Sequence, residues 1–125
     1  MLYAILCYGS EAKISALTPE QDEALMKRLA PVDGALIAEG KLGPHFRLMG
    51  TASAKHLRAG EQLLLDGPFA ETKEQLLGLY LVDCATFEEA VDAARRLEAP
   101  RVASGVGGAL EIRPLRQLFQ GKSLA

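Results

Sequence analysis

The residues best suited to chemistry lie in one short connection, between Leu63 and Glu74. Asp66 ends an apolar run, and Gly67-Pro68 then excludes any regular element, because proline lacks an N–H and restricts the residue before it. A carboxylate held at a strand end beside a rigid turn is suited to general acid–base catalysis. The structural alternative is that Asp66 accepts hydrogen bonds from the N–H groups of its own turn. Asp66 is the first predicted catalytic residue, and both readings stay open.

The same connection continues with alternating charges. In an extended chain Glu71 and Lys73 share one face, and a lysine beside carboxylates is suited to an acidic substrate. A solvated, charged hairpin is the commoner meaning of such a run. We predict Glu71 and Lys73 as substrate-binding residues, against that structural alternative.

Three further side chains complete the predicted site. His45 follows a Gly-Pro pair and is the second predicted catalytic residue, although a lone histidine is often structural. Arg113 is predicted to bind substrate, because a guanidinium recognises carboxylates in bidentate fashion; an interface ion pair with Glu111 is the alternative. Tyr80 is predicted to contact substrate, or else to be a core aromatic.

The sequence predicts neither a metal nor a cofactor. It contains two histidines that are not adjacent, His45 and His56, and no thiolate cluster. The glycine-rich segment 105–108 precedes a strand rather than a helix, so it is not a dinucleotide-binding fingerprint.

The elements that must position these residues alternate along the chain. Apolar runs predict strands at 2–8 and 75–84, and an alternating pattern predicts one at 109–115. A capping box at Thr18 begins a helix that Pro31 or Gly34 ends, and a short strand is predicted at 35–38. A second capping box at Thr86 begins a helix that Pro100 stops. Segments 46–52 and 62–65 are predicted to form a hairpin, and segment 9–15 a polar loop.

This order gives two βαβ-like halves, which predict an α+β sandwich with both helices on one face of the sheet. Strands 2–8 and 76–82 are nevertheless apolar on both faces. One chain has no third helix for the second face, so a second copy is its simplest cover. The sequence therefore predicts a homodimer whose sheets meet face to face.

Composition narrows the class of protein. The 125 residues are enough for one domain, and contents of 49% apolar and 24% charged residues are ordinary for a globular protein. A net charge of −2, with basic and acidic residues interleaved, argues against nucleic-acid binding. The longest apolar run, 2–8, is too short to span a membrane and has no basic segment before it. Together with two cysteines outside any C-x-x-C pair, this predicts a cytoplasmic protein.

The segment Asp66-Gly67-Pro68-Phe69-Ala70-Glu71-Thr72-Lys73-Glu74-Gln75-Leu76 resembles the signature of the YCII-related proteins, in the branch named after its Asp-Gly-Pro-Phe motif. Residues 111–115 resemble the closing strand of that branch. The resemblance covers residues 1–115 as a single domain and leaves 116–125 as a C-terminal tail. It implies a ferredoxin-like α/β sandwich with an inserted hairpin, which forms a dimeric α/β barrel.

The resemblance also implies two functions. Some relatives act on small cyclic or aromatic metabolites through a proposed His–Asp pair, and others are associated with extracytoplasmic-function sigma factors. Two departures matter: segment 19–30 contains no histidine, and Leu77 stands where the family usually has glycine. We expect a small-molecule-binding protein, either an enzyme that moves protons through a carboxylate or a non-catalytic binding or regulatory module.

Overall fold

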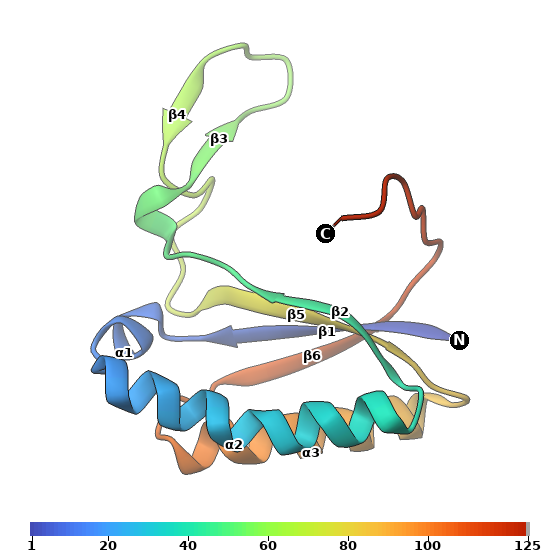
Figure 1. Cartoon of the computed structure of the whole chain (residues 1–125). Coiled ribbons are helices and arrows are strands. Elements are labelled where there is room, and N and C mark those ends of the chain that lie inside the picture. Colours follow the sequence, from blue (N-terminus) through green and yellow to red (C-terminus); the bar gives the residue numbers. More distant parts are fainter. Residues whose placement is uncertain (125) are drawn as a thin grey trace.

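The computed structural model describes residues 1–124 as one four-stranded antiparallel sheet, a small hairpin and a layer of helices (Figure 1). The strand order is β2-β5-β1-β6, which is the ferredoxin-like split βαβ arrangement. In chain order the elements are β1 (Leu2–Gly9), α1 (Glu11–Ser15), α2 (Pro19–Ala38), β2 (Leu42–Arg47), the 3-10 turn η1 (Thr51–Ser53), β3 (Lys55–Leu57), β4 (Leu64–Asp66), β5 (Gln75–Asp83), α3 (Phe87–Ala103) and β6 (Ala109–Pro114).

The core lies between the sheet and the pair of long helices. Alternate residues of the central strands point to the helices and are buried, among them Ile5, Cys7 and Val82. Leu36 of α2 and Leu97 of α3 meet them and are fully buried. The α+β class and the placement of both helices on one face are as predicted.

Within residues 1–124 the opposite face of the sheet carries no α-helix (Figure 1). The hairpin β3–β4 and the segment after β6 rise on this side, and its strand residues stay partly exposed. Leu6 and Leu79 are register partners there, and Phe46 lies beside Leu79 on β2. Leu110 and Ile112 pack towards the helices, whereas Glu111 is exposed, as the alternation of β6 predicts.

Both long helices continue past the prolines that were expected to end them. Pro31 lies inside α2, where its ring is exposed and the carbonyl it leaves free can bind water. Pro100 lies only one turn before the end of α3. The predicted strand at 35–38 is therefore wrong, because those residues form the last turns of α2.

The helices end instead at glycines in the left-handed conformation. At the end of α2, Gly40 has a φ of 73°, and Gly40 N–H and Lys41 N–H bond to the last carbonyls of the helix. At the end of α3, Gly105 has a φ of 75°, and Val106 N–H bonds to Arg101 O at 3.0 Å. Each pattern is a Schellman motif, which a residue with a Cβ disfavours.

The first half of the predicted hairpin is also corrected. Segment 42–47 forms β2, an edge strand that pairs with β5, and Pro44 is tolerated there at an irregularity between Leu42 and His45. The hairpin is formed by β3 with β4, so that His56 pairs with Leu65. Residues 11–15, expected in a loop, form the short helix α1.

The capping residues and the central strands agree with the sequence. Thr18 and Gln21 form the complete capping box, and Thr86 accepts the Glu89 N–H at 3.2 Å. The Glu89 carboxylate accepts the N–H of Ala85, one residue before the cap, rather than the N–H of Thr86. The second capping box is therefore only half formed. None of the helices within residues 1–124 has the length and apolar character to cross a membrane.

Candidate functional site

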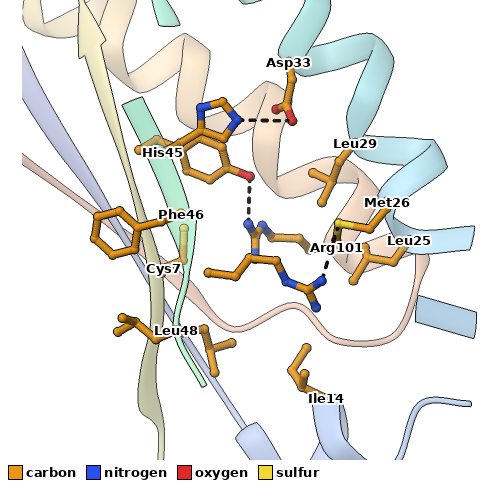
Figure 2. Close-up of a pocket in the computed structure, with 14 residues that line it drawn as sticks. Cys7, Ile14, Leu25, Met26, Leu29, Asp33, His45, Phe46, Leu48 and Arg101 are labelled. Carbon is orange, nitrogen blue, oxygen red and sulfur yellow. Dashed lines mark hydrogen bonds and ion pairs between the residues drawn. The ribbon is translucent and has the colours of Figure 1, made fainter. Parts of the chain in front are cut away.

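A cavity of about 340 Å³ lies between α2, α3 and the sheet, beside the edge strand β2 (Figure 2). We call it the α2–sheet cavity. One end is mainly apolar, although the Arg47 guanidinium reaches Met26 there, and four polar side chains from four different elements meet at the other end. The apolar end is formed by Ile14, Leu25, Met26, Leu29, Leu48 and Leu77; the polar end by Asp33, His45, Tyr80 and Arg101.

The periodicity of the two helices brings Asp33 and Arg101 to the cavity. Asp33 follows Leu29 by four residues, on the face of α2 that is otherwise buried. Arg101 follows Leu97 by four residues on α3 in the same way. Both side chains therefore project from the helices towards the sheet.

The strands supply the other two groups. His45 and Tyr80 are register partners on β2 and β5. Their rings stack with centroids 5.3 Å apart and an interplanar angle of 13°. This stacked pair lines one side of the polar end.

His45 is oriented by two neighbours. Its Nδ1 lies 3.0 Å from the Gly43 carbonyl oxygen, and this contact requires Nδ1 to carry the proton. In the neutral ring Nε2 is then an acceptor, and it lies 3.9 Å from Asp33 Oδ2. The pair can take up a proton at Nε2, after which the charged imidazole is attracted to the carboxylate.

Burial makes Asp33 an unusual carboxyl group. Burial raises the pKa of Asp33, and the positive charges of His45 and Arg101 only partly oppose this effect. Its Oδ1 is buried and has no hydrogen-bond partner within residues 1–124. A carboxyl with a raised pKa in a cavity is a common feature of sites that transfer protons.

Arg101 and Tyr80 form the second pair. Arg101 Nη2 donates to the Tyr80 hydroxyl at 3.0 Å, and its Cζ lies 5.7 Å from the centroid of the Tyr80 ring. Burial raises the pKa of Tyr80, so its hydroxyl stays protonated. The Nε of Arg101 is buried without a partner among the described residues.

Two other cavity residues differ in character. Arg47 is held by a bidentate pair with Asp22, at 2.8 and 3.3 Å, which satisfies its charge. Burial raises the pKa of the Cys7 thiol, so Cys7 is a neutral, apolar part of the cavity wall. Cys7 and Cys84 are both buried and free.

The predicted site residues are distributed over four regions. His45 and Tyr80 come together in the α2–sheet cavity. Asp66 ends β4 in the hairpin, where its side chain is 93% exposed and lies 3.8 Å from Lys55 Nζ. Glu71 and Lys73 are exposed in the connection between β4 and β5. The roles of these three groups stay predictions.

Arg113 lies on β6, next to Ala4 of β1 and on the face without helices. It therefore does not contact the α2–sheet cavity. The role of Arg113 in substrate binding stays a prediction that concerns the open face.

The Asp-Gly-Pro-Phe segment borders a second, wider cavity of about 650 Å³ on the open face, under the hairpin. Its walls are mainly apolar and include Met49, Phe69 and Leu76, with Thr72 and Glu74 at one side. No ion pair or histidine converges on it within residues 1–124. The α2–sheet cavity is the better candidate site, because it combines enclosure with titratable groups.

Sequence reasoning missed Asp33 and Arg101. The available signal was a charged residue at a position that the helical period assigns to the buried face. That signal was lost because each residue lies beyond the proline at which its helix was expected to end.

The fold defines this molecule as an α+β protein with a ferredoxin-like sheet. The family model of the YCII-related domain matches residues 1–116, and the chain belongs to that family. A relative from Rhizobium meliloti (strain 1021), described as an uncharacterized protein, is 50% identical over 117 residues, which is 92% of each chain.

A solved structure shares the fold. It is the 5-chloro-2-hydroxyhydroquinone dehydrochlorinase of Burkholderia phenoliruptrix AC1100, in complex with 2,5-dihydroxybenzoquinone. The two chains superpose with a TM-score of 0.50 and 12% identity, over 93% of this chain and 94% of that one. The predicted family is thus confirmed, and so is the α+β fold.

Proposed function

We propose that this protein binds a small organic molecule in the α2–sheet cavity and transfers a proton on it. His45 is the base, and Asp33 balances the charge that His45 acquires. The observation that carries this proposal is the meeting of Asp33, His45, Tyr80 and Arg101 at one end of an otherwise apolar cavity. Sites of this composition bind small molecules and fix their orientation through the few polar groups.

The size of the cavity supports a ring-sized ligand. A cavity of about 150 Å³ is enough for benzene in a well-studied engineered protein. The α2–sheet cavity, at about 340 Å³, has room for one ring with several substituents. The aromatic rings of His45 and Tyr80, which both line the cavity, favour a planar aromatic molecule.

The chemistry of the pair supports proton transfer. His45 Nε2 is available because Nδ1 is used by the Gly43 carbonyl. Once Nε2 has taken a proton, Asp33 Oδ2 at 3.9 Å stabilises the imidazolium. The imidazolium can then return the proton from Nε2 to the molecule. The dehydrochlorinase of similar fold, which was solved with a dihydroxylated quinone, gives a model ligand for testing these steps.

The test measures deuterium exchange. The ring C–H groups of 2,5-dihydroxybenzoquinone lie between oxygen-bearing carbons and exchange through protonation at carbon. In D₂O, the protein should accelerate loss of their proton NMR signal, and His45→Gln should remove that acceleration, by about 10²–10⁴-fold. His56→Gln is the control, because His56 lies in the hairpin. Equal rates for the wild type and His45→Gln would contradict proton transfer at this site.

The alternative is a non-catalytic binding module that uses the same cavity. It would bind the quinone without accelerating exchange, so the same experiment separates the two functions. The association with extracytoplasmic-function sigma factors that the family resemblance implies remains a prediction.

A further inference from the structure

We infer that the ligand of the α2–sheet cavity carries an oxyanion, and that Arg101 is the residue that binds it. This inference rests on the proposed function in one respect, namely that the cavity is the binding site. It adds the charge of the ligand, the residue that selects for that charge and the orientation of the molecule in the cavity.

The first argument is the unsatisfied charge of Arg101. Arg101 Nη2 donates a hydrogen bond to the Tyr80 hydroxyl, which is neutral. Arg101 Nε is buried without a partner within residues 1–124. Within residues 1–124, no carboxylate oxygen forms an ion pair with the Arg101 guanidinium at 4.0 Å or less. A partly buried guanidinium with five N–H donors is costly when it lacks an anionic partner.

Two other arginines near the helices, Arg47 and Arg96, show what a guanidinium with a bidentate carboxylate looks like. Arg47, also at the cavity, makes two hydrogen bonds to Asp22. Arg96, one turn before Arg101 on α3, makes two to Glu39, at 3.0 and 2.7 Å. Arg101 thus differs from both in facing a cavity without a bidentate carboxylate.

The second argument is that the nearest acid is directed to another partner. Asp33 is the carboxyl that faces the same cavity, and burial raises its pKa. Asp33 is also directed to His45, with Oδ2 at 3.9 Å from Nε2 (Figure 2). The positive charge of Arg101 is therefore available to a ligand.

The third argument is the polarity of the cavity, which fixes how a ligand lies in it. Leu25 and Leu48 line the mainly apolar end, and Arg101 lies at the polar end (Figure 2), where it donates to the Tyr80 hydroxyl. An anionic group at Arg101 places an apolar body against the leucines. The fitting class is a ring-sized organic acid, with a carboxylate or an acidic ring hydroxyl.

The test compares benzoate with its neutral analogue benzamide, by protein NMR titration of the full chain. The wild type should bind benzoate at least tenfold more tightly than benzamide, with shifts at His45 and Tyr80. Arg101→Met should remove this preference, because it weakens benzoate binding far more than benzamide binding. Arg95→Met should keep the preference, because Arg95 lies on the same helix, is exposed and pairs with Asp92.

The outcomes separate the inference from the proposed function. Equal binding of both compounds to the wild type, or a preference that survives Arg101→Met, would overturn the anion site while the cavity stays a binding site. Binding of neither compound in the cavity would overturn both. Arg101→Lys guards against misfolding, because it keeps the charge and should retain a reduced preference for benzoate with an unchanged melting temperature.

Discussion

At the scale of single residues, Asp33 carries the largest conflict between stability and function. It occupies a place on the buried face of α2 where an apolar residue would pack without loss. Burial raises its pKa, which means that its ionised form is less stable in the folded chain than in the unfolded one. A group of this kind is retained for what it does rather than for the stability it gives.

We therefore expect Asp33→Asn to keep or raise stability while it reduces proton transfer. Between the ordinary carboxyl pKa of 3.8 and the raised pKa of the folded state, the native chain binds more protons than the unfolded chain, so ionisation of Asp33 lowers the free energy of unfolding as the pH rises. This fall in the free energy of unfolding with rising pH should be absent in Asp33→Asn. Its charged neighbours are His45 on β2 and Arg101 on α3, with Tyr80 on β5. Thermal melts from pH 3 to 8 measure the effect, and a variant that melts lower than wild type at pH 7 would contradict it.

Asp66 provides the complementary prediction. Because its side chain is 93% exposed and lies outside the α2–sheet cavity, Asp66→Asn should leave deuterium exchange and ligand binding unchanged. Loss of exchange in this variant, with the fold intact, would transfer the catalytic role to the Asp-Gly-Pro-Phe segment.

At the scale of elements, the ends of α2 and α3 decide where the site residues lie. The sequence correctly indicated how both helices begin, because Thr18 and Thr86 satisfy the first N–H groups in a recognisable pattern. It misjudged where they end. A proline on an exposed face or in the last turn removes a single hydrogen bond, whereas Gly40 and Gly105 provide the conformation that closes each helix.

The same error explains which site residues could be predicted. Tyr80 and His45 lie on strands, where an apolar run and a local turn signal drew attention to them. Asp33 and Arg101 became visible only when the helical period was continued past Pro31 and Pro100. The pairing of β2 with β5 rather than with the hairpin depends on contacts distant in sequence, which local patterns do not record.

Two glycine substitutions, one just after the end of α2 and one inside it, test the role of the Schellman motif. Gly40→Ala should destabilise the protein by about 1 kcal/mol, because alanine disfavours the φ of 73°. Gly34→Ala is the matched control: it lies inside α2, an added Cβ would meet no atom within 4 Å, and it should stabilise by about 0.5–1 kcal/mol. Urea unfolding measures both, and equal effects of the two substitutions would contradict this account.

Glu39 ties the end of α2 to α3 and gives a pH-dependent prediction. Its hydrogen bonds to Arg96 and Lys41 lower its pKa from 4.5 to about 2. The stabilisation is present above pH 4.5 and is lost as the pH falls towards about 2. Glu39→Gln should lack this loss of stability between pH 4.5 and about 2. Unfolding measured between pH 2 and 5 is the test, and the same pH dependence of stability in the variant and the wild type would contradict the role of Glu39.

At the scale of the whole molecule, the open face of the sheet is the surface that no α-helix within residues 1–124 covers. Leu6, Leu79 and Phe46 lie on it beside the raised hairpin, and Phe69 is 77% exposed near by. Sheets with one bare apolar face are usually covered in an assembly. We propose that a second copy covers this face, which would complete the dimeric barrel predicted from the strand pattern.

Light scattering at micromolar concentration should therefore give about twice the chain mass of 13.4 kDa. Leu79→Lys places a charge in the middle of the open face and should yield monomers. Val102→Lys is the control, because Val102 is exposed on α3, on the helix side of the molecule. A wild-type protein that is monomeric and stably folded would contradict the barrel.

The central claim, that the α2–sheet cavity is the functional site, is tested most directly by a crystal structure of the protein with bound 2,5-dihydroxybenzoquinone. We expect ligand density between α2 and β2, with the ring against His45 and Tyr80 and an oxygen within hydrogen-bonding distance of Arg101. Density confined to the wider cavity beside Phe69, with an empty α2–sheet cavity, would contradict the account and return the function to the Asp-Gly-Pro-Phe segment.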